Sequence, residues 1–185
     1  AGAAHYYPTG LGAMAVFQNY YLKISGSASN NTVREKAVRL VEACSGIEGK
    51  AGAATVPFHI FSDVFGFPLA QITYERENVF QYGFAQRFWF ARPSLDVGMQ
   101  YFIHEAETPE DAAALYDKLL ENNRFDYDVV EEKEQGVLLK HKFLETFLWM
   151  QHRGRYLFGI DNAPDTATLE KARAKLAKAI ADEQQ

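Results

Sequence analysis

The stretch from Thr108 to Asn123 constrains the fold more than any other part of this sequence, because both of its ends and its apolar face are clearly marked. Thr108 is a favoured N-cap residue, Pro109 suits the first helical position, and acids at 110 and 111 suit the positive end of the helix dipole. Apolar residues then recur at helical spacing until two asparagines end the pattern. The sequence therefore predicts a helix over 109–123 with one apolar face.

Segments with the pattern of β-strands lie on both sides of this helix. Aromatic-rich segments at 82–93 and 96–106 precede it, and shorter alternating segments follow it. This order predicts an α+β fold, an antiparallel β-sheet with helices packed on one face. The remaining expected elements are strands at 127–133, 136–143, 145–151 and 155–160, a strand or hairpin at 13–25, and helices at 31–44 and from about 165 to 181.

An ungapped offset of 135 residues relates the two ends of the chain. Tyr21-Leu22 matches Tyr156-Leu157, and residues 35–37 match residues 170–172. Both segments have the pattern of a hairpin strand, a polar loop and an amphipathic helix. We therefore expect the C-terminal half of one module at 1–50 and a complete second, similar module at 56–185.

Half a module cannot bury its own apolar face, because a strand pair and one helix enclose too little volume. We expect residues 13–45 to dock onto the second module or to pair with another chain. Unpaired sheet edges also make self-association through a sheet edge an expectation. The small residues of 46–55 are typical of a flexible linker.

Composition and motifs exclude several classes of function. The formal net charge of -5 argues against a nucleic-acid binder. The single cysteine, Cys44, excludes an internal disulfide and a multi-cysteine metal site. No apolar run is long enough to span a membrane, and no phosphate-loop or dinucleotide motif suggests a cofactor. Residues 101–150 carry twelve acidic and five basic groups, which favours a solvated face, with a surface for a basic partner as the alternative.

Aromatic side chains supply the first candidate surface. Trp89, Phe90 and Tyr101 lie in the two strands before the helix. Burial in the core is the favoured interpretation for most aromatic residues. If the first module leaves one face of the sheet uncovered, these side chains would line a cleft for a protein partner or a small apolar ligand.

Histidines and acids supply a rival interpretation. In an extended strand His104 faces away from Glu105 and Glu107, so a metal or acid–base site needs His141 or His152 as well. The alternative function is therefore an enzyme, a hydrolase or a metal-dependent one, that uses these residues. A polar strand end is the favoured interpretation of the cluster.

A basic turn supplies a third candidate. His152, Arg153 and Arg155 flank Gly154 and could together bind an anion. A hairpin turn that exposes its charges explains the same pattern and is the favoured interpretation.

Three tracts resemble a bacterial family of proteins of unknown function: ITYERENVFQYGFAQRFWF, ETPEDAAALYDKL and GRYLFGID. The segment GLGAMAVFQNYYLKI is similar to the closing strand pair of that family's first module. The resemblance implies two tandem α+β modules, a Tyr-Gly-Phe tract (here Tyr82 to Phe84) and export to the periplasm or the exterior, although a cytoplasmic location stays open. It implies no catalytic residue. We therefore interpret the chain as a non-enzymatic exported binding module for a protein partner or an apolar ligand.

Overall fold

The computed structural model describes residues 5–17, 20–45, 55–94 and 98–184. The strands are β1 (His5–Thr9), β2 (Gly12–Phe17), β3 (Tyr20–Ser25), β4 (Ile72–Glu75), β5 (Phe88–Ala91), β6 (Gln100–Glu105), β7 (Tyr127–Lys133), β8 (Gly136–His141), β9 (Phe147–Arg153) and β10 (Tyr156–Ala163). The helices are α1 (Asn31–Ser45), α2 (Val56–His59), α3 (Pro109–Asn123) and α4 (Thr166–Asp182), with short helical turns η1 (Ile60–Val64), η2 (Leu69–Gln71) and η3 (Val79–Gln81).

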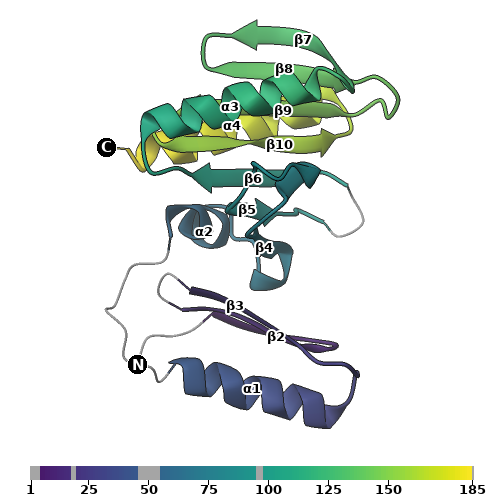
Figure 1. The fold of residues 1–185 in the computed structure, drawn as a ribbon, viewed down its shortest axis with the longest axis vertical. Helices are drawn as coiled ribbons and strands as arrows, with labels where there is room; N and C mark the ends of the chain where they lie inside the picture. The colour runs from purple at the N-terminus through teal and green to yellow at the C-terminus, as the bar shows by residue number, and fades with distance from the viewer. Residues whose placement is uncertain (1–4, 18–19, 46–54, 95–97, 185) are drawn as a thin grey trace.

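These elements form two antiparallel sheets (Figure 1). The smaller sheet has the order β1-β2-β3 and is followed by α1. The larger sheet has the order β4-β5-β6-β10-β9-β8-β7, with β10 inserted between β6 and β9. The predicted α+β class with an antiparallel sheet is confirmed. In the described part of the chain, no helix combines the length and the apolarity that crossing a membrane requires.

Side-chain caps begin the three long helices close to where the sequence predicts them. Asn30, Thr108 and Asp165 each accept a hydrogen bond from the backbone N–H three residues further on, at 2.9, 3.1 and 2.7 Å. Each bond satisfies an N–H group that the first helical turn leaves without a partner. Helix α3 spans 109–123, as predicted from its caps and its apolar spacing.

The strand region before α3 is shorter than its aromatic pattern predicts. Only residues 88–91 pair in β5, and residues 79–87 form a compact turn in which the Val79 N–H donates to the Ala85 carbonyl at 3.0 Å. Arg87 closes the turn with a left-handed backbone, φ 62°. Strand β4, which the sequence pattern did not reveal, pairs with β5 and forms one edge of the sheet.

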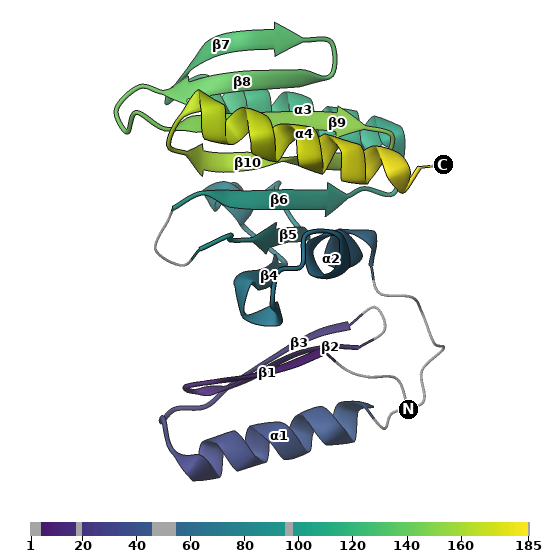
Figure 2. The same ribbon diagram turned by 180° about the vertical axis from the view of Figure 1, so that it is seen from behind.

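Helices cover both faces of the larger sheet, which corrects the expectation of a single covered face (Figures 1 and 2). Leu119 of α3 packs with Phe102 on one face, and Leu176 of α4 packs with Trp149 on the other. The reason is that residues of both parities in β5, β8, β9 and β10 are apolar and buried. A strand that is apolar on both sides needs a cover on both sides.

The smaller sheet docks onto the larger body with the face opposite α1. Ala13 and Ala15 pack against α1, whereas Val16 and Tyr21 join the larger core. The Tyr21 ring lies edge-on to the Trp89 ring, with centroids 5.6 Å apart. The described residues of 13–45 therefore pack on the rest of the chain, which is one of the two outcomes expected for this segment; the other was pairing with another chain.

The 135-residue offset agrees with the helices better than with the strands. It aligns the first residues of α1 and α4, and the buried Ala37 with the buried Ala172. It also aligns Ala15, which faces α1, with Met150, which faces α3 rather than α4. The tandem repeat therefore stays a prediction, and the expected linker, apart from Thr55, lies outside the described residues.

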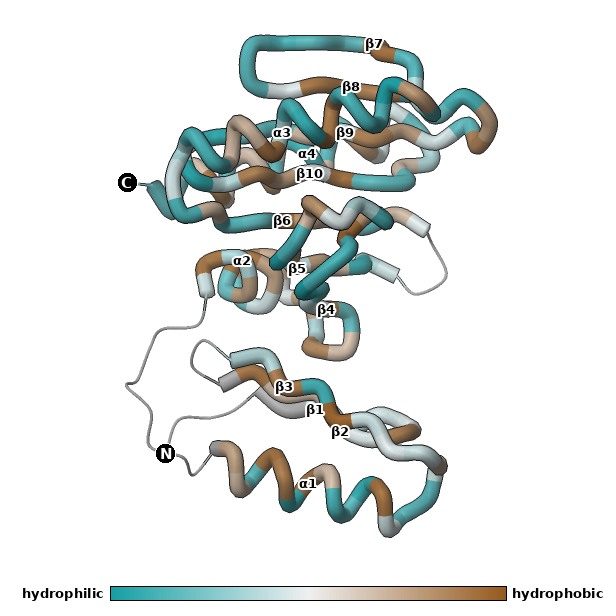
Figure 3. The backbone as a smooth tube through the Cα atoms, viewed as in Figure 1, coloured by the Kyte–Doolittle hydropathy of each residue, from teal (hydrophilic) through white to brown (hydrophobic). Residues whose placement is uncertain are grey.

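Strand β7 forms the exposed edge of the larger sheet and is mostly hydrophilic (Figure 3). Helices α3 and α4 lie over β9 and β10, and Val129 and Val130 of β7 stay 41% and 53% exposed. A bulge lies between 129 and 131, and Asp128, Glu131 and Glu132 add negative charge. Bulges and charges keep edge strands from pairing with other chains, so this edge disfavours the self-association left open by the sequence.

Candidate ligand-binding site

The three aromatic residues that the sequence singled out do not form one cleft. Trp89 and Tyr101 face α4 and are 6% and 7% exposed, whereas Phe90 faces α3 and is 3% exposed. Phe58 of α2 covers Trp89, with ring centroids 5.5 Å apart. Phe65 covers Tyr101, with centroids 5.1 Å apart. All three proposed residues belong to the core, so the expected aromatic surface is not formed by them.

His104 is also a core residue. Its Nδ1 lies 3.2 Å from the Arg87 carbonyl oxygen, and its ring packs on Phe88 with centroids 4.9 Å apart. Burial lowers the pKa of His104, so its neutral form is favoured. Glu107 lies outside this contact and pairs with Arg87 at 3.6 Å.

The basic turn does not assemble an anion site. Arg155 forms an ion pair with Glu105 of the neighbouring strand. The Arg153 carbonyl accepts a hydrogen bond from Gln184 at 2.9 Å. His152 lies on the α3 face, with its ring centroid 5.0 Å from that of Tyr116. Within the residues that the structure describes, no group of three histidine, cysteine, aspartate or glutamate side chains has the arrangement of a metal site.

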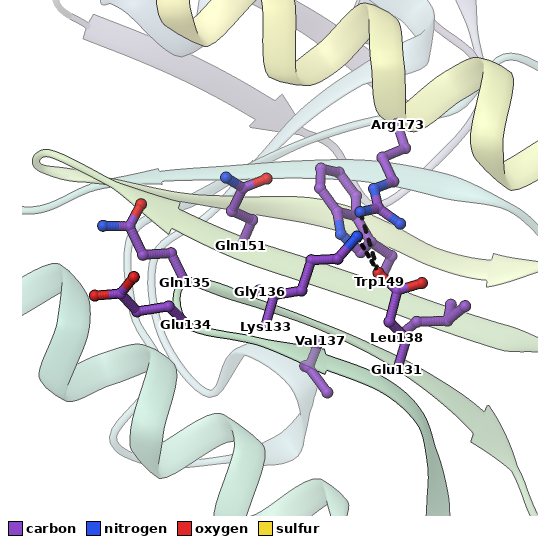
Figure 4. A pocket seen from close by; sticks show the side chains of 10 residues that line it. All are labelled: Glu131, Lys133, Glu134, Gln135, Gly136, Val137, Leu138, Trp149, Gln151 and Arg173. Carbon is purple, nitrogen blue, oxygen red and sulfur yellow. Dashed lines mark ion pairs between the residues drawn. The ribbon is translucent and has the colours of Figure 1, made fainter.

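An open hollow of about 220 Å³ lies between α4 and the β7–β9 end of the sheet (Figure 4). Its charges are already matched, because the Glu131 carboxylate lies 2.5 Å from Lys133 Nζ and 3.6 Å from an Arg173 nitrogen. The Arg173 guanidinium also lies over the Trp149 ring, 5.4 Å from the centroid. The hollow therefore presents ion pairs that satisfy one another and that solvent screens.

A second cavity, of about 230 Å³, lies between α3 and the opposite face of the sheet. We call it the tyrosine cavity. It is open to solvent on one side, and its walls combine apolar side chains and aromatic rings with polar groups from the ends of several elements. The lining residues are Phe80, Gln81, Tyr82, Phe102, Leu119, Asn123, Asp126, Tyr127, His141, Leu148, Met150 and Asp161.

Asp161 contributes a buried carboxylate to this cavity. It is 9% exposed and lies near the end of β10, on the same face as Leu157 and opposite Gln100 of β6. Its Oδ1 accepts the Asn162 backbone N–H at 2.8 Å, and its Oδ2 accepts the side-chain amides of Asn162 and Gln100 at 3.0 and 3.3 Å. Burial raises the pKa of Asp161, although these hydrogen bonds and the nearby His141 oppose the shift.

His141 also lines the cavity, and its Nδ1 is held by the backbone. The backbone N–H groups of Phe143 and Leu144 donate to His141 Nδ1 at 3.1 and 3.2 Å. Because Nδ1 is an acceptor, a neutral His141 carries its proton on Nε2. The imidazole lies edge-on to Tyr127, with centroids 4.7 Å apart, so the two rings form one side of the cavity.

Two tyrosines bring hydroxyl groups into the cavity. Burial raises the pKa of Tyr127, and the negative charges of Asp161 and Asp126 raise it further. Burial and Asp126 likewise raise the pKa of Tyr82. Both phenols therefore stay protonated at neutral pH and offer O–H donors.

One wall of the cavity has an unusual backbone. Phe80 and Gln81 have left-handed conformations, φ 53° and 65°, and Asn78 before them has φ 56°. Asn162, beside the buried carboxylate, has φ 55°. Such conformations are unfavourable for residues other than glycine, and they gather at binding sites because the surrounding structure holds them in place.

Three exposed apolar residues lie close in sequence to residues that line the cavity, and we call them the apolar tip. They are Phe125, Phe143 and Leu144, which are 83%, 78% and 61% exposed. The two loops that carry them are tied together, since Lys142 Nζ donates to the Phe125 carbonyl at 2.7 Å. The tip is therefore held in place before any ligand arrives.

Sequence reasoning missed most of this site. It ended the last strand at residue 160, whereas β10 continues to Ala163 through a register shift after Ile160. The available signal was an aspartate directly after the apolar run 157–160. If the strand continues past residue 160, this carboxylate is buried, and a buried carboxylate is unusual enough to suggest a function. Of the candidate site residues named from the sequence, His141 lines the cavity, and so does Tyr82 of the Tyr-Gly-Phe tract.

Comparisons of the chain with models of known protein families, with curated proteins and with solved structures find no match.

Proposed function

We propose that the protein is a non-enzymatic binding protein that holds a small, mostly apolar ligand in the tyrosine cavity. The observation that carries the proposal is the buried Asp161 carboxylate, which lines the same cavity as the buried apolar side chains of Phe102, Leu148 and Met150. Apolar walls with a few convergent polar groups are the usual composition of ligand sites. The walls would supply affinity, and the polar groups would orient the ligand.

The polar groups suit binding because most already have fixed positions. Asp161 is held by three hydrogen bonds, and His141 Nδ1 by two. A site that is ordered in advance loses little conformational entropy when a ligand binds. The cavity thus offers one carboxylate acceptor, Asp161, together with donors from the tyrosine hydroxyls and His141.

The test is a fragment screen followed by NMR chemical-shift changes on the labelled protein. We expect binders to shift resonances of α3, β8 and β10 rather than those of β4 or the smaller sheet. The variant Tyr127→Phe removes one hydroxyl and should weaken these binders about fivefold, as expected for one hydrogen bond of about 1 kcal/mol. Tyr101→Phe, which removes a hydroxyl on the opposite face, is the matched control. Binders whose affinity is unchanged in Tyr127→Phe and whose shift changes lie outside α3, β8 and β10 would contradict the proposal.

A second candidate function is general acid–base catalysis in the same cavity. It is favoured by one observation: Asp161, whose pKa is raised by burial, and the imidazole of His141 line one cavity. His104, Glu105, Glu107 and His152 do not line the cavity. Conversion of a bound fragment, detected by mass spectrometry and lost in His141→Gln, would support this candidate over simple binding.

The proposal includes a bacterial, exported protein with two tandem modules. The family resemblance of the three tracts supports this part, and the helix register at the 135-residue offset agrees with it. Fractionation of cells that express the native gene tests the location. Recovery of the protein with cytoplasmic markers alone would contradict it.

A further inference from the structure

We infer that the ligand of the tyrosine cavity is an organic cation, a protonated amine on a small apolar body. This inference rests on the proposed function, because it names the chemical class that the proposed site would take. It follows from the charges, hydrogen bonds and aromatic faces around Asp161.

The first step is the charge of the lining residues. In the described part of the chain, the residues that line the cavity include Asp126 and Asp161 but no lysine or arginine. Basic side chains near the mouth are engaged elsewhere: Lys142 Nζ donates to backbone carbonyls, Lys140 pairs with Glu145 at 2.6 Å, and Arg124 pairs with Glu132 at 3.2 Å. The cavity therefore has a negative potential that repels anions and attracts cations.

The second step is the nature of the groups around the buried carboxylate. Among the described residues, the hydrogen-bond donors to Asp161 are amide groups of Asn162 and Gln100, all of them neutral, and His141 lies near enough to lower the pKa of the carboxyl. A buried carboxylate ordinarily has a cationic partner or takes up a proton. Two oxygens can accept about four hydrogen bonds, and the described residues supply three, so an ammonium N–H could take a further position.

The third step is the aromatic surface that surrounds this position. The aromatic residues Phe80, Tyr82, Phe102 and Tyr127 line the cavity. Aromatic faces attract cations through the ring quadrupole, most strongly where water is excluded. The apolar residues of α3 and β9 would contact the hydrocarbon part of the same ligand. The site thus matches an amine attached to a ring or a short chain better than an anion or a sugar.

The test compares three probes of the same shape and different charge: 2-phenylethylamine, 2-phenylethanol and 3-phenylpropionate. Isothermal titration calorimetry measures their affinities, and NMR shifts locate them. We expect the amine to bind at least about tenfold more tightly than the alcohol, and the anion to bind most weakly. An alcohol or an anion that binds the cavity as tightly as the amine overturns the inference and leaves the proposed function standing. If none of the three binds, both are overturned.

Asp161→Asn removes the charge and keeps the shape. We expect it to lower the affinity for the amine about thirtyfold and to leave the affinity for the alcohol within about twofold. Asp128→Asn, an exposed acid on β7, is the matched control and should change neither value. An unchanged amine affinity in Asp161→Asn overturns the inference.

A measurement on the unaltered protein covers the case in which Asp161→Asn does not fold. Burial raises the pKa of Asp161, so the amine must displace a proton wherever the carboxyl is protonated. Amine affinity should then fall about tenfold per pH unit below that pKa, whereas alcohol affinity should stay flat. Equal pH profiles for the two probes overturn the inference.

Discussion

Replacement of Gly159 by alanine tests how closely β10 packs against β6 and β9, the strands that help to line the cavity. Gly159 lies in the middle of β10, opposite Phe102 of β6 and Met150 of β9. A Cβ there would fall inside van der Waals contact with the Trp149 carbonyl oxygen and would lie 2.8 Å from Phe102 Cε1, whereas ordinary contacts begin at 3.4 Å. The carbonyl is part of the backbone and cannot rotate away, so β10 must move.

Overpacking of a closed core costs about 1–3 kcal/mol, and we expect Gly159→Ala near the upper limit because three paired strands share the displacement. At about 2–4 °C for each kcal/mol, the melting temperature should fall by about 6–12 °C. Circular dichroism measures the shift. Gly83→Ala is the control, because its Cβ would meet its nearest atom, Asn78 Oδ1, at 3.8 Å. A melting temperature of Gly159→Ala equal to that of the unaltered protein would refute the packing of β10 against β9 and β6.

Three further changes probe other parts of the fold. Thr108→Ala removes the cap of α3 and its bond from Asp111, so urea denaturation should show a loss of about 1 kcal/mol, and no loss would mean the cap is dispensable. Tyr21→Ala removes the edge contact with Trp89, so hydrogen exchange should become faster in the smaller sheet and stay unchanged in β8–β10. Exchange rates in the smaller sheet equal to those of the unaltered protein would contradict the packing of this sheet on the larger body. Burial lowers the pKa of His104, so the unfolded state binds its proton more readily and stability falls as pH drops below the ordinary value of 6.5. His104→Leu should make stability depend less on pH, as measured by urea midpoints above and below pH 6.5. An unchanged pH dependence would mean that other groups cause it.

The helices could be predicted from the sequence because their signals are local. The caps at Thr108 and Asp165 lie three residues from the N–H groups they satisfy, and apolar spacing marks the buried face. Most strands after α3 could be placed for the same reason, by alternation and turn residues. Residues 82–87 of the turn were mistaken for strand, because their aromatic residues fit either structure and the sequence does not reveal the left-handed backbone at Arg87.

The two covered faces and the cavity depended on contacts between distant parts of the chain. Residues 156–161 of β10 pair with residues 100–105 of β6, and no local pattern specifies that neighbour. Asp161, His141, Tyr127 and Tyr82 come from four separate segments that meet only after the sheet is ordered. The sequence by itself determined the helix starts and the α+β class, because these follow from local hydrogen bonding and from the spacing of apolar residues. Only the tertiary structure decided which carboxylate is buried and which rings surround it, because strand order and sheet register are long-range choices.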